Sequence, residues 1–452
     1  WGELAMNSLK KTLRDIAQYP SAIFGMIIVL ALVSLAVYAV VTIPYNEAIR
    51  LWRGGEEIWY QNPKNVPPAW FNYFTARDLP ESFAVKSGEE GFTKEVIPGE
   101  QNTTTINFSY PIEFNYDDYP QEILLYFNTT YEAKQPFVSI YLNTPDGREI
   151  RISDFGVSRK QTYRFSQDEK LVRRLKGVVT MKGLFSVPES DPLTPLKGTY
   201  ELVINGLTFE QGSDINAELV FHGQLFGIAG TDHARRDLSV ALLWGAPIAL
   251  AFGLLAAAGT SVLTMIIAAI GTWYSGWVDE LIQRITEVNL VLPFLPILIM
   301  IGTFVDRSIW TILGATIALS IFTGSIKTYR AIFMQVKEST YIEAAKAYGA
   351  SDGRVIFKYL IPRMIPLLLP TLVSAVASYV FLEASLAVLG LGDPVLPTWG
   401  KIVNDAFTNG ALYKGYYYWI LEPAVLLMIT GLGFAGLGFA LDRIFNPRLR
   451  GV

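Results

Sequence analysis

Long apolar runs alternate with polar segments along this chain, and several runs are long enough to cross a lipid bilayer. A helix of about 20 apolar residues spans the hydrocarbon core. The pattern predicts six spans, at about residues 22–43, 240–270, 285–304, 310–329, 364–389 and 418–440. We therefore expect an α-helical membrane protein with six transmembrane helices.

The distribution of positive charge predicts the orientation of these spans. Lys10, Lys11 and Arg14 precede the first span, which places the N-terminus in the cytoplasm. Counting crossings then puts both the C-terminus and the loop between the fourth and fifth spans inside. Lysines and arginines gather at those two places, as the orientation requires: Lys327, Arg330, Lys337, Lys346, Arg354, Lys358, Arg363, Arg443, Arg448 and Arg450.

The segment between the first two spans, residues 51–225, has a different pattern and must lie outside. Short runs of alternating polarity predict strands at 123–127, 137–142, 149–152, 200–204 and 217–221. Pro145-Asp146-Gly147 and Asn205-Gly206 are hairpin signals. We expect an inserted, all-β extracellular domain, a sandwich or jelly-roll-like fold with its core at about 100–222, between residues 1–50 and a helical core at 226–452.

Three N-glycosylation sequons, which begin at Asn102, Asn107 and Asn128, lie in this segment. None occurs in the other parts of the chain. Their confinement favours glycosylation at these three asparagines and supports the outside placement.

A polar segment, Tyr341 to Pro362, separates the fourth and fifth spans. Helical spacing brings Ala344, Ala345, Ala347 and Tyr348 together beside the charged Glu343 and Lys346, and Gly349 is expected to end that helix. A second apolar run at helical spacing follows, and Ile361 and Pro362 lead into the next span. The pattern fits either an ordinary amphipathic loop helix or a surface that docks a partner.

Glu343-Ala344-Ala345, with Gly349 four residues further on and then Ile361-Pro362, resembles the EAA loop of ABC importer membrane subunits. The resemblance implies a short coupling helix that inserts into a groove on an ATPase subunit. Glu343, Ala344, Ala345, Lys346, Tyr348, Gly349, Ile361 and Pro362 would make up this site. Small alanines would allow close helix approach, and the glycine a tight turn.

The rest of the helical core is similar to the second membrane subunit of the dipeptide and oligopeptide (and nickel) permease family. The motifs that carry the similarity are Gly230-Thr231-Asp232 with Arg236-Asp237, Trp244-Gly245-Ala246, Leu382 to Leu386, Leu389 to Gly392, Pro397 to Gly400, Leu441 to Arg443, and Asn446 to Arg448. Three features depart from the family pattern. Glu287, after the similar stretch Asp279 to Arg284, stands where the family usually has aspartate. Arg235 stands where a glycine is usual, and the large insertion replaces a short connection.

The resemblance implies the type I ABC importer fold and a permease subunit that imports peptides by alternating access in the cell membrane. Its partners would be a homologous second permease subunit, two ATPase subunits that bind ATP and Mg, an extracellular solute-binding protein and membrane lipid. The chain has no phosphate-binding loop of its own, so we expect no catalysis, cofactor or metal in it. Its net charge of -4 gives no indication of nucleic-acid binding.

Charged residues near or within the spans are candidates for a gate. Glu383 falls inside the fifth span, where a charge needs a partner or a water-filled cavity, and we favour a packing hydrogen bond over substrate contact. Arg284 and Glu287 lie near the cytoplasmic end of the third span, with an interfacial role favoured over gating. Small-residue spacing predicts close helix packing at Gly431, Gly433, Gly436 and Gly438.

Other functions remain open from the sequence. The same permease fold could import oligosaccharides. A secondary transporter would need paired ionisable residues within its spans, and this chain has essentially one deep charge. A membrane-tethered binding or adhesion protein would account for the β domain, but it would leave the later spans and the EAA loop without a role.

Overall fold

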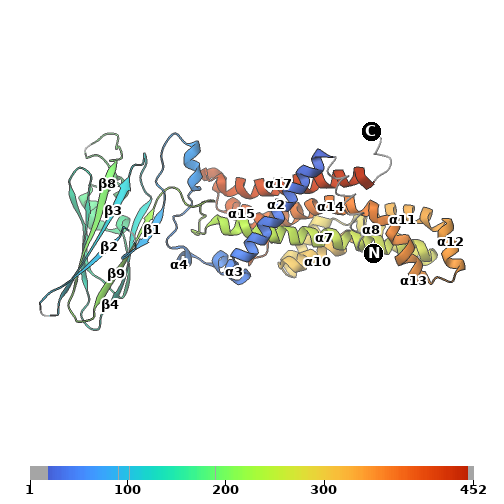
Figure 1. Cartoon of the computed structure of the whole chain (residues 1–452), viewed down its shortest axis with the longest axis horizontal. Coiled ribbons are helices and arrows are strands. Elements are labelled where there is room, and N and C mark those ends of the chain that lie inside the picture. The colour runs from blue at the N-terminus through green and yellow to red at the C-terminus, as the bar shows by residue number, and fades with distance from the viewer. Residues whose placement is uncertain (1–18, 90, 101, 189, 446–452) are drawn as a thin grey trace, which may run out of the picture. The chain divides into compact units, whose positions relative to one another are not determined.

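The computed structural model describes residues 19–445 except 90, 101 and 189, and the chain divides into two compact units (Figure 1). We call residues 1–53 with 240–452 the helical unit, and residues 54–239 the inserted unit. The charges at Lys10, Lys11, Arg14, Arg448 and Arg450, and the Asn446 to Arg448 motif, lie outside the described residues.

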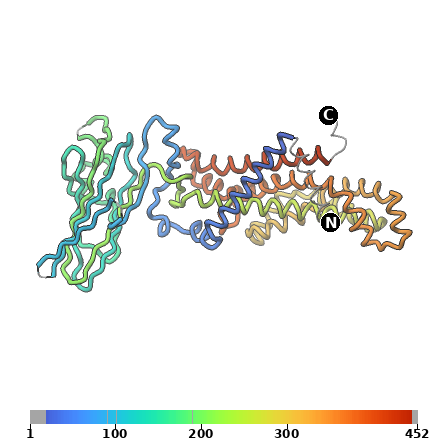
Figure 2. The backbone as a smooth tube through the Cα atoms, in the orientation of Figure 1, coloured from blue at the N-terminus to red at the C-terminus, as the bar shows by residue number. Residues whose placement is uncertain are grey.

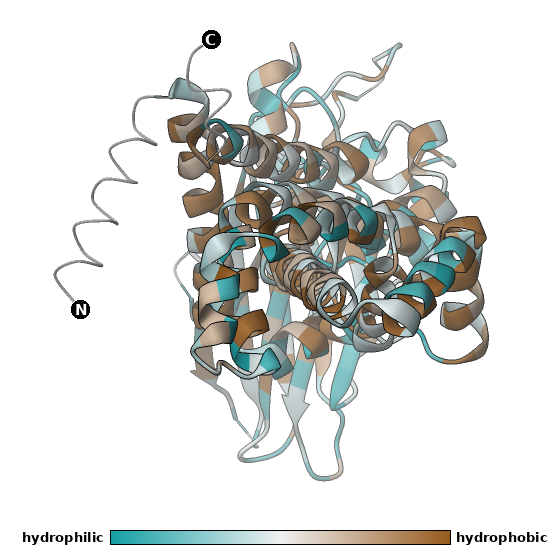
Figure 3. Ribbon diagram, turned by 90° about the vertical axis from the view of Figure 1, so that its right-hand side faces the viewer, coloured by the Kyte–Doolittle hydropathy of each residue, from teal (hydrophilic) through white to brown (hydrophobic). Residues whose placement is uncertain are grey.

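The helical unit consists of long apolar helices joined by short ones, and apolar residues cover much of their length (Figure 3). Its helices are α2 (Pro20–Thr42), α3 (Tyr45–Arg53), α7 (Leu238–Tyr274), α8 (Gly276–Val291), α9 (Phe294–Phe304), α10 (Ile309–Ile321), α11 (Gly324–Lys337), α12 (Thr340–Ala347), α13 (Asp352–Val355), η3 (Ile356–Leu360), α14 (Ile361–Leu386), η4 (Ala387–Leu391), α15 (Trp399–Thr408), α16 (Ala411–Lys414) and α17 (Tyr418–Phe445).

Four stretches are long and apolar enough to cross a membrane unbroken, and the described residues reach six if each of two bent helix pairs counts as one span. The third and fourth predicted spans are these bent pairs. Helices α8 and α9 meet at 81°, and α10 and α11 at 49°. Pro293 explains the first bend, because proline has no N–H for the helix ladder and forces Leu292 into an extended conformation.

Helices from the two ends of the chain, α2 and α17, pack side by side (Figure 2). A Cβ on Gly25 would lie 2.7 Å from the carbonyl oxygen of Gly433, so only glycine allows this approach. Gly438 meets Ser374 of α14 in the same way, and Gly431 meets Phe381. The predicted close packing of the α17 glycines is therefore confirmed.

The inserted unit contains two antiparallel sheets, with strand orders β1-β9-β4-β7 and β2-β3-β8-β5-β6. Without the edge strand β2, this is the strand order of a jelly roll with two four-stranded sheets. Successive strands of the roll lie in opposite sheets, except for the hairpin formed by β5 and β6. The strands are β1 (Phe83–Lys86), β2 (Thr93–Pro98), β3 (Thr104–Phe114), β4 (Glu122–Thr130), β5 (Phe137–Asn143), β6 (Glu149–Gly156), β7 (Lys160–Arg164), β8 (Gly198–Thr208) and β9 (Asp214–His222).

Side chains from both sheets form one core, which includes Phe108, Leu125, Ile140 and Leu219. Short helices also belong to the unit, so it is not purely β: α4 (Glu56–Trp59), η1 (Ala69–Phe74), η2 (Phe165–Gln167), α5 (Glu169–Arg174) and α6 (Thr180–Phe185). The first strand begins at Phe83, earlier than the expected start of the core near residue 100.

One of the two hairpin signals is wrong. Pro145-Asp146-Gly147 does join the antiparallel neighbours β5 and β6. Asn205 and Gly206, however, lie inside β8, where they pair with both β3 and β5. A Cβ on Gly206 would lie 2.8 Å from Ile215 Cδ1, so this glycine makes room for the opposite sheet instead of forming a turn.

Candidate coupling site

Helix α12 carries the Glu-Ala-Ala sequence and ends in a tight glycine turn. Gly349 has a φ of +78°, the left-handed conformation that side chains disfavour. Its N–H donates to Lys346 O at 2.9 Å, and the N–H of Ala350 donates to Ala345 O at 3.0 Å. These two bonds form a Schellman motif, so Gly349 ends the helix as predicted.

The two faces of α12 have different surroundings. Ile342 and Ala345 are buried, and Ile342 belongs to a buried cluster with Val355, Leu360 and Met364. The opposite face is exposed, and its residues are Glu343, Ala344, Ala347 and Tyr348, the last with 93% of its surface accessible. Ala345 thus packs within this chain, and the exposed face leaves Ala344 and Tyr348 free for contact with a partner.

The segment after the turn holds α12 against the next long helix. Helix α13 and the π-helical turn η3 run without a break into α14, so Ile361 and Pro362 lie in the first turn of α14. Ile361 is buried in the same cluster as Ile342. The residues of the predicted site therefore lie in one contiguous segment, α12 to the start of α14. Ala345 and Ile361 are buried in it.

Trp273, near the C-terminal end of α7, has two cations close to its ring. Lys346 Nζ of α12 is 4.4 Å from the centre of its ring, and Lys337 Nζ of α11 is 5.8 Å away. Lys337 also donates to the carbonyl oxygens of Thr272 and Trp273, at 2.9 and 3.0 Å. These contacts attach α12 and α11 to the end of α7.

A second ionic contact fixes α8 to α11 in the same region. Arg330 Nε donates to Asp279 Oδ1 at 2.7 Å, and the guanidinium reaches both carboxylate oxygens. Arg330 and Lys337 are seven residues apart, so they lie on one face of α11. Helix α11 thus joins α8, the end of α7 and, through Trp273, helix α12.

A hollow of about 530 Å³ lies beside the two helix bends. Its polar lining is uncharged and consists of Asn289, Ser320, Thr323, Ser378 and Tyr379. Asn289 Nδ2 donates to the carbonyl oxygens of Leu319 and Phe322, at 2.9 and 2.8 Å. The side chain thereby satisfies backbone groups freed where α10 ends, which is how a broken helix is tolerated within a membrane.

The candidate gate residues fall into two groups. Glu383 is buried in α14, and the Thr398 hydroxyl lies within hydrogen-bonding reach of it. This geometry fits the packing interpretation. Arg284 and Glu287 form an exposed ion pair at 3.2 Å on α8, and Lys327 lies 4.0 Å from Glu287. Such exposed pairs contribute little to stability.

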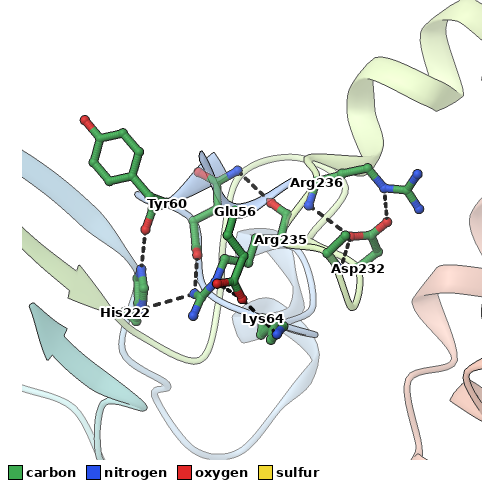
Figure 4. Close-up of polar contacts among 9 residues, drawn as sticks. Glu56, Tyr60, Lys64, His222, Asp232, Arg235 and Arg236 are labelled. Atoms are coloured by element: carbon green, nitrogen blue, oxygen red, sulfur yellow. Dashed lines mark hydrogen bonds and ion pairs between the residues drawn. The ribbon is translucent and has the colours of Figure 1, made fainter. Parts of the chain in front are cut away.

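The Gly230-Thr231-Asp232 motif, near the end of the inserted unit, is hydrogen-bonded to a segment near its beginning. The N–H of Thr231 donates to Val66 O at 2.9 Å, and the N–H of Asn65 donates to Asp232 O at 3.2 Å. The two segments that connect the unit to the helices are therefore joined side by side. Asp232 also forms an ion pair with Arg236, with 2.5 Å between Asp232 Oδ2 and Arg236 Nε (Figure 4).

Arg235 replaces the usual glycine without loss of the turn. Its φ is +66°, the conformation in which glycine is favoured. Its guanidinium donates to Asn62 O at 2.7 Å and lies 3.4 Å from His222 Nδ1, while Asn62 Nδ2 donates to Arg235 O (Figure 4). These contacts offset the cost of the backbone conformation, about 1 kcal/mol.

His222 is buried beside this turn and is held in its neutral form. Its Nε2 lies 3.2 Å from Tyr60 O, a hydrogen bond that requires the proton on Nε2 and leaves Nδ1 as an acceptor facing Arg235. Burial lowers the pKa of His222 to about 4, and the positive charge of Arg235 lowers it as well. Within the described residues, no group of three or more His, Asp or Glu side chains could hold a metal ion.

The three sequon asparagines differ in accessibility. Asn102 is an exposed turn residue and Asn128 is exposed near the end of β4. Asn107 lies in the middle of β3, between β2 and β8, and is half-buried.

Two residues of the site were missed by sequence reasoning. Trp273 ends an apolar span, where a tryptophan is an ordinary interfacial residue, so only its neighbours Lys337 and Lys346 distinguish it. Asn289 stands in an otherwise apolar run next to Pro293, and this combination is a usable signal. A polar side chain four residues before a membrane proline can satisfy the carbonyls of a broken helix.

Known proteins match the helical part of the chain. A family described as "binding-protein-dependent transport system inner membrane component" matches residues 260–451. The oligopeptide transport system permease protein OppC of Bacillus subtilis (strain 168) is 32% identical over 226 residues, which cover 49% of this chain and 72% of OppC. The dipeptide transport system permease protein DppC of the same organism is 28% identical over 222 residues, 49% of this chain and 68% of DppC. The glutathione transport system permease protein GsiD of Escherichia coli O6:K15:H31 (strain 536 / UPEC) is 29% identical over 232 residues, which cover 49% of this chain and 72% of GsiD.

Proposed function

This chain belongs to the family of binding-protein-dependent transport system inner membrane components, and on that premise we propose that it is the permease subunit of an ATP-driven importer of peptides. The relatives named above transport oligopeptides, dipeptides and glutathione, all of which contain peptide bonds. The hollow beside the helix bends offers amide and hydroxyl groups and no charged side chain, which suits hydrogen bonds to a peptide backbone.

The exposed face of α12 is the observation that carries this proposal. Glu343, Ala344 and Tyr348 project outward from a helix whose other face is buried in its own unit. This face would dock an ATPase subunit, so that closure of the ATPases on ATP moves α12. The movement would reach α7 and α8 through Trp273, Lys346 and the Asp279–Arg330 pair.

The proposed assembly contains this chain, a homologous second permease subunit, two ATPase subunits that bind ATP and Mg, and an extracellular solute-binding protein. Both termini would be cytoplasmic and the inserted unit extracellular. Exposure favours Asn102 and Asn128 as glycosylated positions over Asn107, which lies within a sheet. Digestion with a glycosidase, followed by mass measurement of the inserted unit, tests this assignment.

The docking role is tested by Ala344→Arg, which adds a large charged side chain to the exposed face of α12. We expect loss of ATP-dependent uptake of a short peptide by vesicles that contain the complex, because volume added at a close helix contact is not tolerated. The chain itself should still fold and insert. Ala133→Arg, at an exposed position of the inserted unit, is the matched control. Normal uptake and normal ATPase binding by Ala344→Arg would refute the docking role.

A further inference from the structure

Five large apolar side chains gather on the surface of the inserted unit. Four belong to the short helix η1, namely Trp70, Phe71, Tyr73 and Phe74, and the fifth is Ile228. Tyr73 is 88% exposed, Ile228 80% and Phe74 78%. The rings of Trp70 and Phe74 are 6.0 Å apart, and Trp70 Nε1 donates to Ile228 O at 2.8 Å. We call these five residues the aromatic patch.

The exposure of the patch is built into the structure of η1. Asn72, in the middle of the helix, turns away from the aromatic residues and makes three hydrogen bonds with the chain that follows. Its Nδ2 donates to Asp78 Oδ1 and Leu79 O, and its Oδ1 accepts from Leu79 N, all at 2.8–3.1 Å. The N–H of Ala69 donates to Gly227 O at 2.9 Å. These bonds fix the helix so that its apolar side chains face outward.

The patch is tied to the start of a membrane span. Leu238, the first residue of α7, donates its N–H to Gly230 O at 3.1 Å, and α7 is apolar enough to cross a membrane. Ile228 is two residues before Gly230, a separation of about 7 Å at most. The patch is therefore held within a short distance of the first residue of α7, a helix that is long and apolar enough to cross a membrane.

The composition of the patch matches that of the bilayer interface. Tryptophan and tyrosine are enriched at the level of the lipid headgroups, because each combines an apolar ring with a polar group. Exposed apolar groups of this kind gain free energy when they leave water. We propose that the aromatic patch inserts into the interfacial region of the leaflet at which α7 begins, and so holds the inserted unit against the membrane surface.

The chain contains no cysteine, so a single spin label can be placed at will. We would label Tyr73→Cys in the full chain reconstituted into phosphatidylcholine vesicles, and measure the accessibility of the label to oxygen and to a water-soluble nickel chelate. The label should be accessible to oxygen and shielded from nickel. Val179→Cys, another apolar position of the inserted unit that is 65% exposed, is the matched control and should be accessible to nickel.

The same label in a chain that also carries Phe71→Asp and Phe74→Asp should regain accessibility to nickel. Continued shielding in that variant would show that the patch is not what holds the segment in lipid. A label at residue 73 that is as accessible to nickel as the one at residue 179 would overturn the proposal. Shielding from both reagents that develops only when partner subunits are added would also overturn it, in favour of a protein partner.

Discussion

His222 makes the inserted unit sensitive to acid. The neutral ring accepts a hydrogen bond from Arg235, and a proton on Nδ1 would instead face the guanidinium. The unfolded chain takes up this proton near a pKa of about 6.5, whereas the folded chain does so only at about 4. The neutral His222 therefore makes its full contribution to the free energy of unfolding above pH 6.5, and this contribution is lost as the pH falls towards 4.

We expect residues 54–239 to lose about 3 kcal/mol of unfolding free energy between pH 6.5 and 4 because of His222, at 1.36 kcal/mol for each pKa unit. Urea unfolding at several pH values measures the loss. His222→Gln keeps a donor and an acceptor without the titration, so it should remove this component. His233→Gln should retain it, and equal pH dependence in wild type and His222→Gln would rule out the assignment.

Arg235 combines an unfavourable backbone conformation with favourable side-chain contacts, and two substitutions separate these effects. Arg235→Ala loses the contacts with Asn62 and His222 and keeps a positive φ, whereas Arg235→Gly loses the contacts and relieves the backbone. The glycine variant should therefore be more stable than the alanine variant by about 1 kcal/mol. Thermal or urea unfolding of residues 54–239 checks this order, and an alanine variant of equal or higher stability would contradict it.

At the scale of elements, the proposed coupling depends on Trp273 of α7, whose ring lies 4.4 Å from Lys346 Nζ of α12. Lys346→Met removes the cation closest to its ring and leaves Ala344 and Tyr348 unchanged. A lost cation–π contact of about 0.5–1 kcal/mol corresponds to about a two- to fivefold change in a coupling equilibrium. We expect uptake per ATP hydrolysed to fall by that factor.

Lys346→Arg keeps the cation and should restore the ratio of uptake to ATP hydrolysis. Binding of the ATPase subunits should be normal in both variants. This outcome separates the contact from docking, because a docking defect would lower subunit binding as well. Unchanged coupling in Lys346→Met would exclude a role for the Trp273 contact in transmission.

The sequence predicted the elements whose pattern is local. The spacing of apolar residues predicted helix α12 and the positions of the spans. Gly349 predicted where α12 ends. The strands β1, β2, β3 and β7 were missed. Strands β1 and β7 are short, and the exposed β2 shows no alternation of burial, whereas β3 alternates over part of its length and could have been predicted. Asn205-Gly206 was misassigned because its role depends on Ile215 in the opposite sheet, a contact that local sequence does not reveal.

The candidate site also combines features that local sequence reveals with features that it does not. Residue spacing singled out Glu343 to Gly349, but it could not show which alanine faces inward. The inward face of α12 is the one that carries Ile342, which packs with Val355, Leu360 and Met364, and these residues come from later segments. The break after Ile321 likewise involves Asn289, whose partners Leu319 and Phe322 are 30 residues or more away.

At the scale of the whole molecule, the inserted unit should fold without the helices. Its core is shared between the two sheets and is complete within residues 83–221. Expressed alone, residues 54–239 should give a β-type circular dichroism spectrum and a single cooperative melt. The aromatic patch could reduce solubility, so Tyr73→Ser with Phe74→Ser is a useful second form. A helical spectrum or a gradual melt in both forms would show that the unit depends on the rest of the chain.

The hydrogen bonds between Asn65 and Asp232, and between Val66 and Thr231, bring the entering and leaving segments of the jelly roll together. A polypeptide whose two ends already meet can be added to a loop with little further entropy of closure. The jelly roll can therefore be regarded as a cassette, that is, a folded unit inserted into a loop through two adjacent ends. Evolution could gain, lose or exchange such a cassette at this junction, and the spacing of the helices on either side would not have to change.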